Sequence, residues 1–495
     1  MTDYSPINQP SLTTHKWWAM LGIGLGTLMA TIDASIVNIS LPTLAGIFHT
    51  NFATIQWVVL SYALMLTSLM LGIGRLGDLL GKKKLYNIGL VIFTVGSFLC
   101  GMSPSVEWLI GYRALQGLGA AMTAALGTAI ITEVFPSSER GRALGISGSI
   151  VSVGIALGPP IGGLLIGLVG WRFIFLVNVP IGVIATFVVA RVVPTLPPHK
   201  TGERFDYTGA LIALATLICY ALGMTFWQAQ GLYSSATLAL LAAGGIGVII
   251  FFLVETRNKH PMVDLTMFRN VLFSLNLIMA FLVFVVLAGN FIAPFYLELV
   301  KGYPTEQVGL FMMVYPVCMG SIAPIAGGLS DRYGSRLISL VGLIFIIAGC
   351  YSISTLQVNT NMGGIVLRLI PFGLGMGIFQ SPNNSAVMGT APPERLGVAS
   401  GLLALARTLG QTTGLPLMGA LFTTTLLTTG HLATGADITN APPAALVEGV
   451  SGTYQIAAVI ILAATALAAL ALWIDNRAKR KVPMEISSPE PQGHI

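Results

Sequence analysis

The sequence predicts an all-α membrane protein, and three observations support this fold class. Of the 495 residues, 54% are hydrophobic and only 9% are charged, whereas about a quarter of the residues are charged in soluble domains. The mean hydropathy is +0.82. Apolar stretches of roughly 20 residues, the length that a bilayer core requires, recur from Trp17 to Trp473 with only short polar breaks. The chain therefore has no room for a large soluble domain.

The apolar stretches predict fourteen transmembrane helices. We expect them at residues 17–41, 54–73, 85–103, 108–134, 143–168, 173–192, 207–227, 235–254, 271–299, 307–328, 337–356, 362–389, 397–425 and 452–474. The polar segment 1–16 lacks the features of a cleavable signal peptide, so we expect it to remain as an N-terminal tail. Residues 476–495 are expected to form a C-terminal tail, and their composition after Lys481 is typical of a disordered segment.

Basic residues lie almost entirely on one side of the predicted membrane. If the N-terminus is cytoplasmic, the outside loops hold only Arg172 and Lys301. The inside loops then hold Arg75, Lys82, Lys83, Lys84, Arg140, Arg142, Arg191, Lys200, Arg204, Arg257, Lys259, Arg269, Arg332, Arg336, Arg395, Arg477, Lys479, Arg480 and Lys481. By the positive-inside rule, we expect a multi-pass protein of the plasma (inner) membrane with both termini cytoplasmic. The same rule accounts for the net charge of +6 without a nucleic-acid partner.

Cysteine and histidine positions do not indicate a metal site. All four cysteines fall within apolar segments, where they are interpreted as small buried hydrophobic residues. All six histidines fall in predicted loops or tails. We therefore expect no metal, no cofactor and no metalloenzyme activity.

One glycine pattern resembles a nucleotide-binding motif. Gly72-Ile-Gly74-Arg-Leu-Gly77 matches the letters of the dinucleotide pattern, but it follows an apolar helix rather than a strand. The sequence contains no Walker A motif either. We therefore expect an ion gradient, and specifically a proton gradient, to supply the energy.

An internal repeat divides the predicted helices into two halves. Three pairs of residues lie in similar motifs at nearly the same separation. Asp78 and Asp331 are 253 residues apart (331 − 78), and Arg113 and Arg368 are 255 apart (368 − 113). Arg140 and Arg395 are also 255 apart (395 − 140). This repeat predicts six-helix bundles at 17–192 and 271–475, with two inserted helices within 207–254. Parallel repeats of this kind place a substrate site near the bilayer midplane, between the halves.

Five motifs, in order along the chain, resemble those of the major facilitator superfamily and its fourteen-helix drug:proton antiporter branch. They are Ile32-Asp33-Ala-Ser-Ile36-Val37-Asn38 with Leu41-Pro42, Gly74-Arg-Leu-Gly-Asp78-Leu-Leu-Gly81-Lys82-Lys83, Arg113-Ala-Leu-Gln116-Gly117-Leu-Gly119, Gly154-Ile-Ala-Leu-Gly158-Pro159-Pro160-Ile-Gly162-Gly163, and Trp171-Arg172 with Asn178 and Pro180. The resemblance covers nearly the whole chain. It implies a major facilitator fold of two six-helix bundles plus two inserted helices, and it implies that Asp33 carries protons.

The chemistry of these residues suggests proton coupling at the first helix. An ionised carboxylate at bilayer depth is costly unless it faces water or a partner, so Asp33 is a candidate functional residue. Counted from the helix ends, Asp33 and Arg113 lie at similar depths and are expected to meet. Arg113 keeps its charge, so its expected role is to bias the carboxylate. A static ion pair between two helices remains the alternative.

Further polar residues are candidates for the cavity and its gates. The cavity candidates are Asn38, Gln116, Asn290, Arg368, Gln380 and Asn383, although helix-bridging hydrogen bonds are an equal alternative for the last two. The gating-loop candidates are Gly74, Asp78, Gly81, Lys82, Asp331, Arg332 and Gly334. The antiporter motif Gly154, Gly158, Pro159 and Gly162 is expected to form a tight, bendable contact between the halves, with ordinary packing as the alternative.

The leading functional hypothesis is multidrug efflux: a monomeric proton-coupled antiporter that exports lipophilic or amphipathic small molecules by alternating access. The alternative on the same fold is an exporter or flippase of an endogenous metabolite or lipid. A membrane sensor needs a soluble output domain and a membrane enzyme needs a catalytic cluster, and the sequence suggests neither. Because Arg368 and Arg407 lie in predicted helices of the second half, we expect monovalent or neutral lipophiles to be better cargo than dications, with monocations and anions both tolerated.

Overall fold

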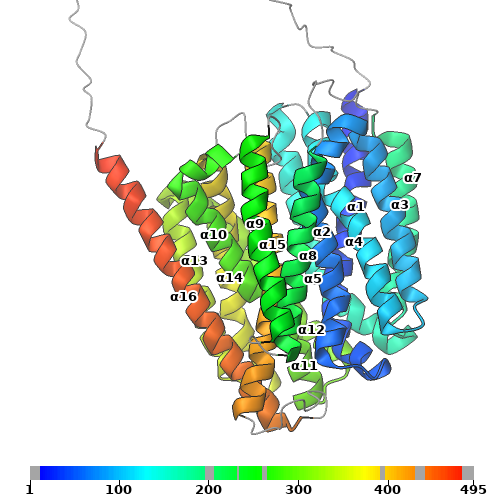
Figure 1. Cartoon of the computed structure of the whole chain (residues 1–495), viewed down its shortest axis with the longest axis vertical. Coiled ribbons are helices and arrows are strands. Elements are labelled where there is room, and N and C mark those ends of the chain that lie inside the picture. The colour runs from blue at the N-terminus through cyan, green and yellow to red at the C-terminus, as the bar shows by residue number, and fades with distance from the viewer. Residues whose placement is uncertain are drawn as a thin grey trace, which may run out of the picture.

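A computed structural model describes residues 12–135, 137–194, 206–230, 234–258, 265–390, 396–429 and 441–481. These residues form helices that run side by side through the height of the molecule (Figure 1). The first half contains α1 (Leu12–Ile47), α2 (Phe52–Leu80), α3 (Lys82–Gly101), α4 (Val106–Val134), α5 (Ser137–Val169), α6 (Phe173–Leu176) and α7 (Asn178–Val192). Then follow α8 (Tyr207–Gln230), α9 (Ser235–Arg257), the 3-10 turn η1 (Leu265–Arg269), α10 (Val271–Ala288), the 3-10 turn η2 (Gly289–Phe291), α11 (Ile292–Phe295), the π-helix η3 (Tyr296–Val300), α12 (Thr305–Tyr333), α13 (Ser335–Ser354), α14 (Met362–Thr390), α15 (Leu396–Thr429) and α16 (Pro443–Lys481).

The described helices match the predicted membrane spans. Twelve of them are long and apolar enough to cross a bilayer, with α6 joined to α7 and α10 joined through to η3. The other two predicted spans are α8, with an apolar stretch at Thr208–Met224, and the 34-residue α15. Large apolar side chains such as Leu168, which is 78% exposed, cover the outer surface. An all-helical membrane fold is therefore confirmed.

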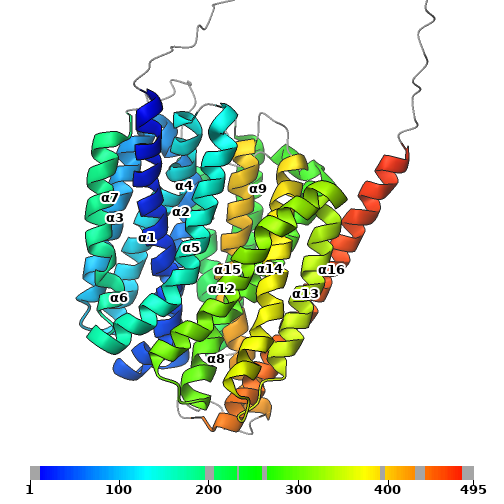
Figure 2. The ribbon, with the colours of Figure 1, turned by 180° about the vertical axis from the view of Figure 1, so that it is seen from behind.

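The helices gather in two groups with a pair of helices across their junction. Elements α1 to α7 lie on one side of the molecule and α10 to α16 on the other (Figures 1 and 2). The pair α8 and α9 packs together, and α8 also packs on α2 and α15, one helix from each group. The pair therefore bridges the two groups instead of belonging to either.

Both ends of the described chain lie at one end of the molecule. The start of α1 and the end of α16 are at the top of both views (Figures 1 and 2). We call this end the terminal end, and we call the opposite one, where α1 ends and α2 begins, the distal end. Basic residues Lys82 and Arg336 lie at the terminal end, at the starts of α3 and α13.

Prolines make the helices differ from the simple predicted spans. The predicted helix 173–192 is interrupted at Val177, because Pro180 has no N–H to donate to the carbonyl of Leu176. The predicted helix 271–299 changes to a 3-10 turn and then a π-helix, since Pro294 leaves the carbonyl of Asn290 without its helical donor. In contrast, α1 continues through Pro42 to Ile47.

Equivalent loops of the two groups share an unusual backbone conformation. Gly81, between α2 and α3, has φ of 96°, and Gly334, between α12 and α13, has φ of 91°. A side chain strongly disfavours these values, so glycine is required at both turns. Because the two glycines occupy matching places in the repeated loop motif, the backbone repeats along with the sequence.

The two groups share one buried core at the distal end. One hydrophobic cluster joins residues of α1 and α2 to residues of α10, α12 and α15, and within it the ring of Phe52 lies 4.9 Å from Phe295 and 5.6 Å from Phe291 and Phe422 between centroids. Toward the terminal end, each group has a separate cluster, one around Tyr86 and the other around Phe273. Among the described residues, the hydrophobic core is therefore continuous between the halves at the distal end.

Glycines bring α5 against α12 in the same distal region. A Cβ on Gly163 would lie 2.5 Å from the carbonyl oxygen of Thr305, and a Cβ on Gly309 would lie 2.5 Å from that of Pro159. These distances are far below van der Waals contact, so the backbones approach closely only because both residues are glycine. Together with the Phe52 cluster, this contact closes the distal end.

The antiporter motif is placed differently from the prediction. Gly154 faces Thr31, Gly158 faces Ser35 and Gly162 faces Ile39, all of which belong to α1 in the same half. The Ser35 hydroxyl also donates to the carbonyl of Gly154 at 3.3 Å. The expectation that these three glycines form the contact between halves is therefore wrong. A helix has two faces: Pro159, the fourth residue of the predicted set, and Gly163 turn toward α12, so the predicted contact between the halves is made at Pro159.

Matched substitutions at Gly163 and Gly158 separate gating from packing. Gly163→Ala places a methyl group against the Thr305 carbonyl, so we expect it to shift the protein toward states with an open distal end. Gly158→Ala places its methyl group against Ser35 within one half, where overpacking costs about 1–3 kcal/mol of stability. Cysteine accessibility at the distal end and thermal melting measure the two effects. If Gly158→Ala changed accessibility and Gly163→Ala did not, this assignment of the two faces would be wrong.

Candidate functional site

The centre of the first half holds a buried ion pair. Asp33 of α1 is 0% exposed and Arg113 of α4 is 1% exposed. Arg113 Nη1 donates to Asp33 Oδ2 at 2.6 Å. The side-chain amides of Gln116 and Asn178 donate to Asp33 Oδ1 at 2.8 and 2.9 Å. The predicted meeting of Asp33 and Arg113 is therefore observed, and three donors surround the carboxylate.

The guanidinium group of Arg113 is held from several directions. Its Nε donates to the carbonyl oxygen of Val58 at 2.9 Å, and Nη1 also donates to the Oε1 atom of Gln116 at 2.5 Å. Its Cζ lies 4.3 Å from the ring centroid of Tyr62 and 5.8 Å from that of Phe175. A buried charge requires this kind of compensation, because its desolvation is costly unless hydrogen bonds replace water.

Close helix packing positions Gln116 within this network. A Cβ on Gly96 of α3 would lie 2.9 Å from the Cα atom of Gln116, so glycine allows α3 and α4 to touch there. Gln116 Nε2 then reaches the Ser97 hydroxyl at 2.7 Å as well as Asp33. In the α4 motif, Gln116 thus contacts the ion pair, and the next residue, Gly117, packs against α2. A Cβ added to Gly117 would meet the carbonyl oxygen of Tyr62.

A cavity of about 350 Å³ lies beside the ion pair, between the two halves. Arg113 lines it, whereas Asp33 does not. The other lining residues come from α1, α2, α4 and α5 on one side and from α10, η2, α12, α14 and α15 on the other: Ala30, Thr31, Ala34, Ser35, Asn38, Val59, Tyr62, Ala63, Leu66, Ala120, Ala124, Ile155, Pro159, Phe284, Leu287, Ala288, Asn290, Phe291, Met312, Tyr315, Pro316, Met319, Gln380, Gln411 and Leu415. Mostly apolar walls with a few polar groups are typical of a small-molecule site.

Four amides line the cavity without hydrogen-bond partners in the described part of the chain. They belong to Asn38, Asn290, Gln380 and Gln411. The Oδ1 atom of Asn38 is buried, so the absence of a partner there is costly. These amides are free to bind a polar molecule within the cavity.

The structure supports only part of the predicted cavity set. Asn38, Asn290 and Gln380 line the cavity, whereas Gln116 belongs to the ion-pair network. Asn383 is 0% exposed and does not line the cavity, and neither atom of its amide has a partner within the described residues. The prediction for Arg368 is wrong. Its Nε donates to Thr355 Oγ1 at 2.9 Å near the distal end of α14, away from the cavity.

The predicted gating loops lie at the terminal end of the helices. Lys82 forms an ion pair with Glu133 of α4, and Arg332 is exposed, with its guanidinium 5.4 Å from the ring centroid of Tyr333. Nearby, Arg336 forms an ion pair with Asp475 of α16. The backbones of Gly74, Asp78 and Asp331 are helical, but the surroundings of these three residues lie outside what the structure describes.

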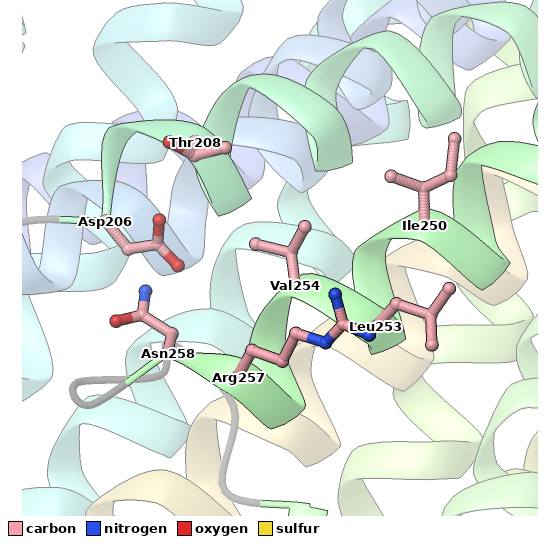
Figure 3. A pocket seen from close by; sticks show the side chains of 7 residues that line it. All are labelled: Asp206, Thr208, Ile250, Leu253, Val254, Arg257 and Asn258. Carbon is pink, nitrogen blue, oxygen red and sulfur yellow. The ribbon is translucent and has the colours of Figure 1, made fainter.

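A second hollow, of about 330 Å³, lies between the terminal ends of α8 and α9. The side chains of Asp206 and Asn258 face each other across it (Figure 3). Asp206 Oδ1 accepts from the backbone N–H of Gly209 at 2.8 Å and so stabilises the start of α8. Its lining residues all come from the inserted pair and its ends, so this hollow is separate from the cavity between the halves.

Sequence reasoning missed several residues of the site. Asn178 was noted only as part of a motif, yet it donates directly to Asp33. Tyr62, Tyr315 and Gln411 line the cavity and were not considered as cavity residues. A polar side chain inside an apolar span is the signal that would have identified Asn178 and Gln411.

Comparison with known proteins agrees with this architecture. The family model described as "Major Facilitator Superfamily" matches residues 23–415 of this chain. The riboflavin transporter RibZ of Clostridioides difficile is 36% identical over 83% of this chain and 89% of its own length. The multidrug resistance protein Stp of Mycobacterium tuberculosis is 32% identical over 81% of this chain and 75% of its own length.

A solved structure shows the same fold. A bacterial homolog of the human lysosomal transporter Spinster, crystallised in an inward-facing and unoccupied conformation, superposes with a TM-score of 0.66 at 17% identity, over 92% of this chain and 97% of that one. The two helical groups and the cavity between them, the match along most of the chain and the similar membrane transporters lead to one conclusion: this chain belongs to the major facilitator superfamily.

Proposed function

We propose that this protein is a proton-coupled antiporter of the fourteen-helix drug:proton branch, which exports amphipathic small molecules by alternating access. The observation that carries the proposal is a shared residue. Arg113 lines the cavity between the halves and also donates to the buried Asp33. A cargo molecule in the cavity and a proton on Asp33 therefore both act on the same guanidinium group.

Competition through Arg113 supplies the coupling in this proposal. While Asp33 is ionised, its charge holds Arg113 in place and leaves the cavity open to cargo. Once Asp33 is protonated, the charge-assisted hydrogen bond weakens, and Arg113 becomes free to move into the cavity that it lines. Because the displaced side chain takes up space that the cargo would fill, proton binding thereby opposes cargo binding, as antiport requires.

The closed distal end supports a defined direction of transport. We propose that the terminal end is cytoplasmic, because Lys82 and Arg336 lie there whereas Arg172 and Lys301 lie distally. The continuous distal core then makes this conformation closed to the outside. Cargo would enter from the cytoplasm, and breaking the contacts of Phe52 and Gly163 would release it outside.

Export of an endogenous heterocyclic metabolite is the second candidate function. Four unpartnered amides in the cavity favour a cargo with several hydrogen-bonding groups over a plain hydrophobic one. Among the relatives, one is named a riboflavin transporter and another a multidrug resistance protein. Transport of riboflavin and of lipophilic dyes by energised vesicles distinguishes the two candidates.

Asp33→Asn tests the coupling role directly. The amide keeps the shape of the carboxylate and removes the group that binds a proton, so we expect proton-driven export to fall to background while the protein remains inserted and folded. Dye efflux from energised vesicles measures this. Glu107→Gln makes the same charge change at the exposed start of α4 and should leave export unchanged. Undiminished export by Asp33→Asn would contradict the proposal.

Asn178→Ala tests whether the donors around Asp33 tune its protonation. Removing a hydrogen bond to a charged group costs about 1.5–3 kcal/mol of its stabilisation. The ionised form of Asp33 is thereby disfavoured, so the pH profile of transport should move to higher pH. The transport rate of vesicles, measured from acid to alkaline pH, reveals the shift of this profile. A uniform loss of activity with an unchanged profile would assign Asn178 a purely structural role.

A further inference from the structure

We propose that the cargo of this transporter is a neutral or anionic aromatic molecule rather than a cation, and that Arg407 of α15 binds its anionic group. This inference rests on the proposed function, since it names the class of cargo for the same cavity. It depends on the charges that line the cavity, on one buried arginine without an acidic partner, and on the unpartnered amides.

The cavity offers no carboxylate to a cation. None of the described residues that line it is an aspartate or a glutamate. Asp33 is fully buried behind the lining, and its oxygens accept from three donors. A cationic cargo would therefore have to displace these donors before it reached the charge, and desolvation makes an uncompensated cation costly in this environment.

Arg113 balances Asp33 and leaves no excess charge of either sign. Its Nε and Nη1 atoms donate to Val58, Asp33 and Gln116 at distances of 2.5 to 2.9 Å. The pair is thus internally neutral while it is intact. Any preference for charged cargo must come from another residue near the cavity.

Arg407 is that residue. Its Nη2 donates to the side-chain oxygen of Asn384, and its Nε is buried without a hydrogen-bond partner. In the described part of the chain, no carboxylate forms an ion pair with it. An arginine in a low-dielectric site with one free donor and no counter-ion is prepared to bind an anion.

Arg407 lies at the edge of the cavity. Its Cζ atom is 5.4 Å from the ring centroid of Phe284, which lines the cavity. Gln411 and Gln380 both line the cavity. Arg407 lies one helical turn from Gln411, and Asn384 lies one helical turn from Gln380. The pair Arg407 and Asn384 therefore lies one helical turn from two lining residues, on the terminal side of the cavity and beside the ring of Phe284.

The amides and aromatic rings that line the cavity indicate the shape and the hydrogen-bonding groups of the rest of the cargo. Asn38 and Asn290 lie on opposite halves, and each presents to the cavity an amide that has no partner among the described residues. Tyr62 and Tyr315 add ring surfaces to the same walls. A flat molecule with hydrogen-bonding edges satisfies these groups, and an acidic substituent on it would reach toward Arg407.

Binding of two matched xanthene dyes tests the inference. Fluorescein is anionic near pH 8 and rhodamine 123 is cationic, while their ring systems have nearly the same shape. We expect purified full-length protein to bind fluorescein at least about tenfold more tightly, as expected for a charge acting across a partly buried site. Arg407→Gln should weaken fluorescein binding about tenfold and leave rhodamine 123 binding unchanged or stronger.

Two further variants separate a binding role from a structural one. Arg407→Lys keeps the charge and should recover much of the fluorescein affinity. Arg368→Gln makes the same charge change at the distal end of α14, away from the cavity, and should leave both dyes unaffected. Rhodamine binding by Arg407→Gln also reports that the variant is folded.

The outcomes for the dyes are independent of those for proton coupling. Equal affinity of the wild-type protein for both dyes, or an equal loss of both in Arg407→Gln, would overturn the anion subsite. Neither result would affect the role of Asp33, which depends on vesicle transport. Conversely, active transport by Asp33→Asn would refute antiport while a clear preference for fluorescein still stood.

Discussion

The ion pair between Asp33 and Arg113 is the interaction on which the rest of this structure depends. Both side chains are buried at membrane depth, where an unpaired charge is prohibitively costly. The side-chain amides of Gln116 and Asn178 stabilise the carboxylate, and the ring of Tyr62 stabilises the guanidinium group. These side chains come from α4, α7 and α2, so the ion pair and its partners connect four helices, with α1 contributing Asp33.

The same interaction connects the interior of one half with the surface between halves. Arg113 touches Asp33 on one side and the cavity on the other. Within the part of the chain that the structure describes, the two halves share a core at the distal end, where Phe52 and the contact of Gly163 with Thr305 join them. A change of charge at the ion pair therefore acts on a residue that lines the cavity between the halves, which is where the proposed alternating access would need it.

Depth and periodicity were sufficient to predict the main elements of the site. Asp33 and Arg113 were expected to meet because they lie at similar depths, and Asn38, Asn290 and Gln380 were expected to line a cavity between the halves, as they do. The helices were predictable because a bilayer requires long apolar stretches. The exact breaks at Val177 and Gly289 were not, since prolines alter a helix only where its neighbours allow it.

Other features depend on which way a side chain turns, and the sequence pattern does not determine this. Arg368 is the repeat partner of Arg113, but the position equivalent to Asp33 holds no acid in the second half, and Arg368 binds Thr355 instead. Gly158 and Gly163 lie on one helix and pack against different halves. Only the packed arrangement shows which glycine lies between the halves.

Proton release on cargo binding tests the central claim most directly. A neutral cargo, chosen by vesicle transport so that it does not itself titrate near neutral pH, releases no proton of its own, so any proton released when it binds purified protein in weakly buffered solution comes from the protein. The account predicts release by the wild-type protein and none by Asp33→Asn, with binding retained in both. Equal release by the two proteins, or binding to the wild type without any release, would contradict proton coupling at Asp33.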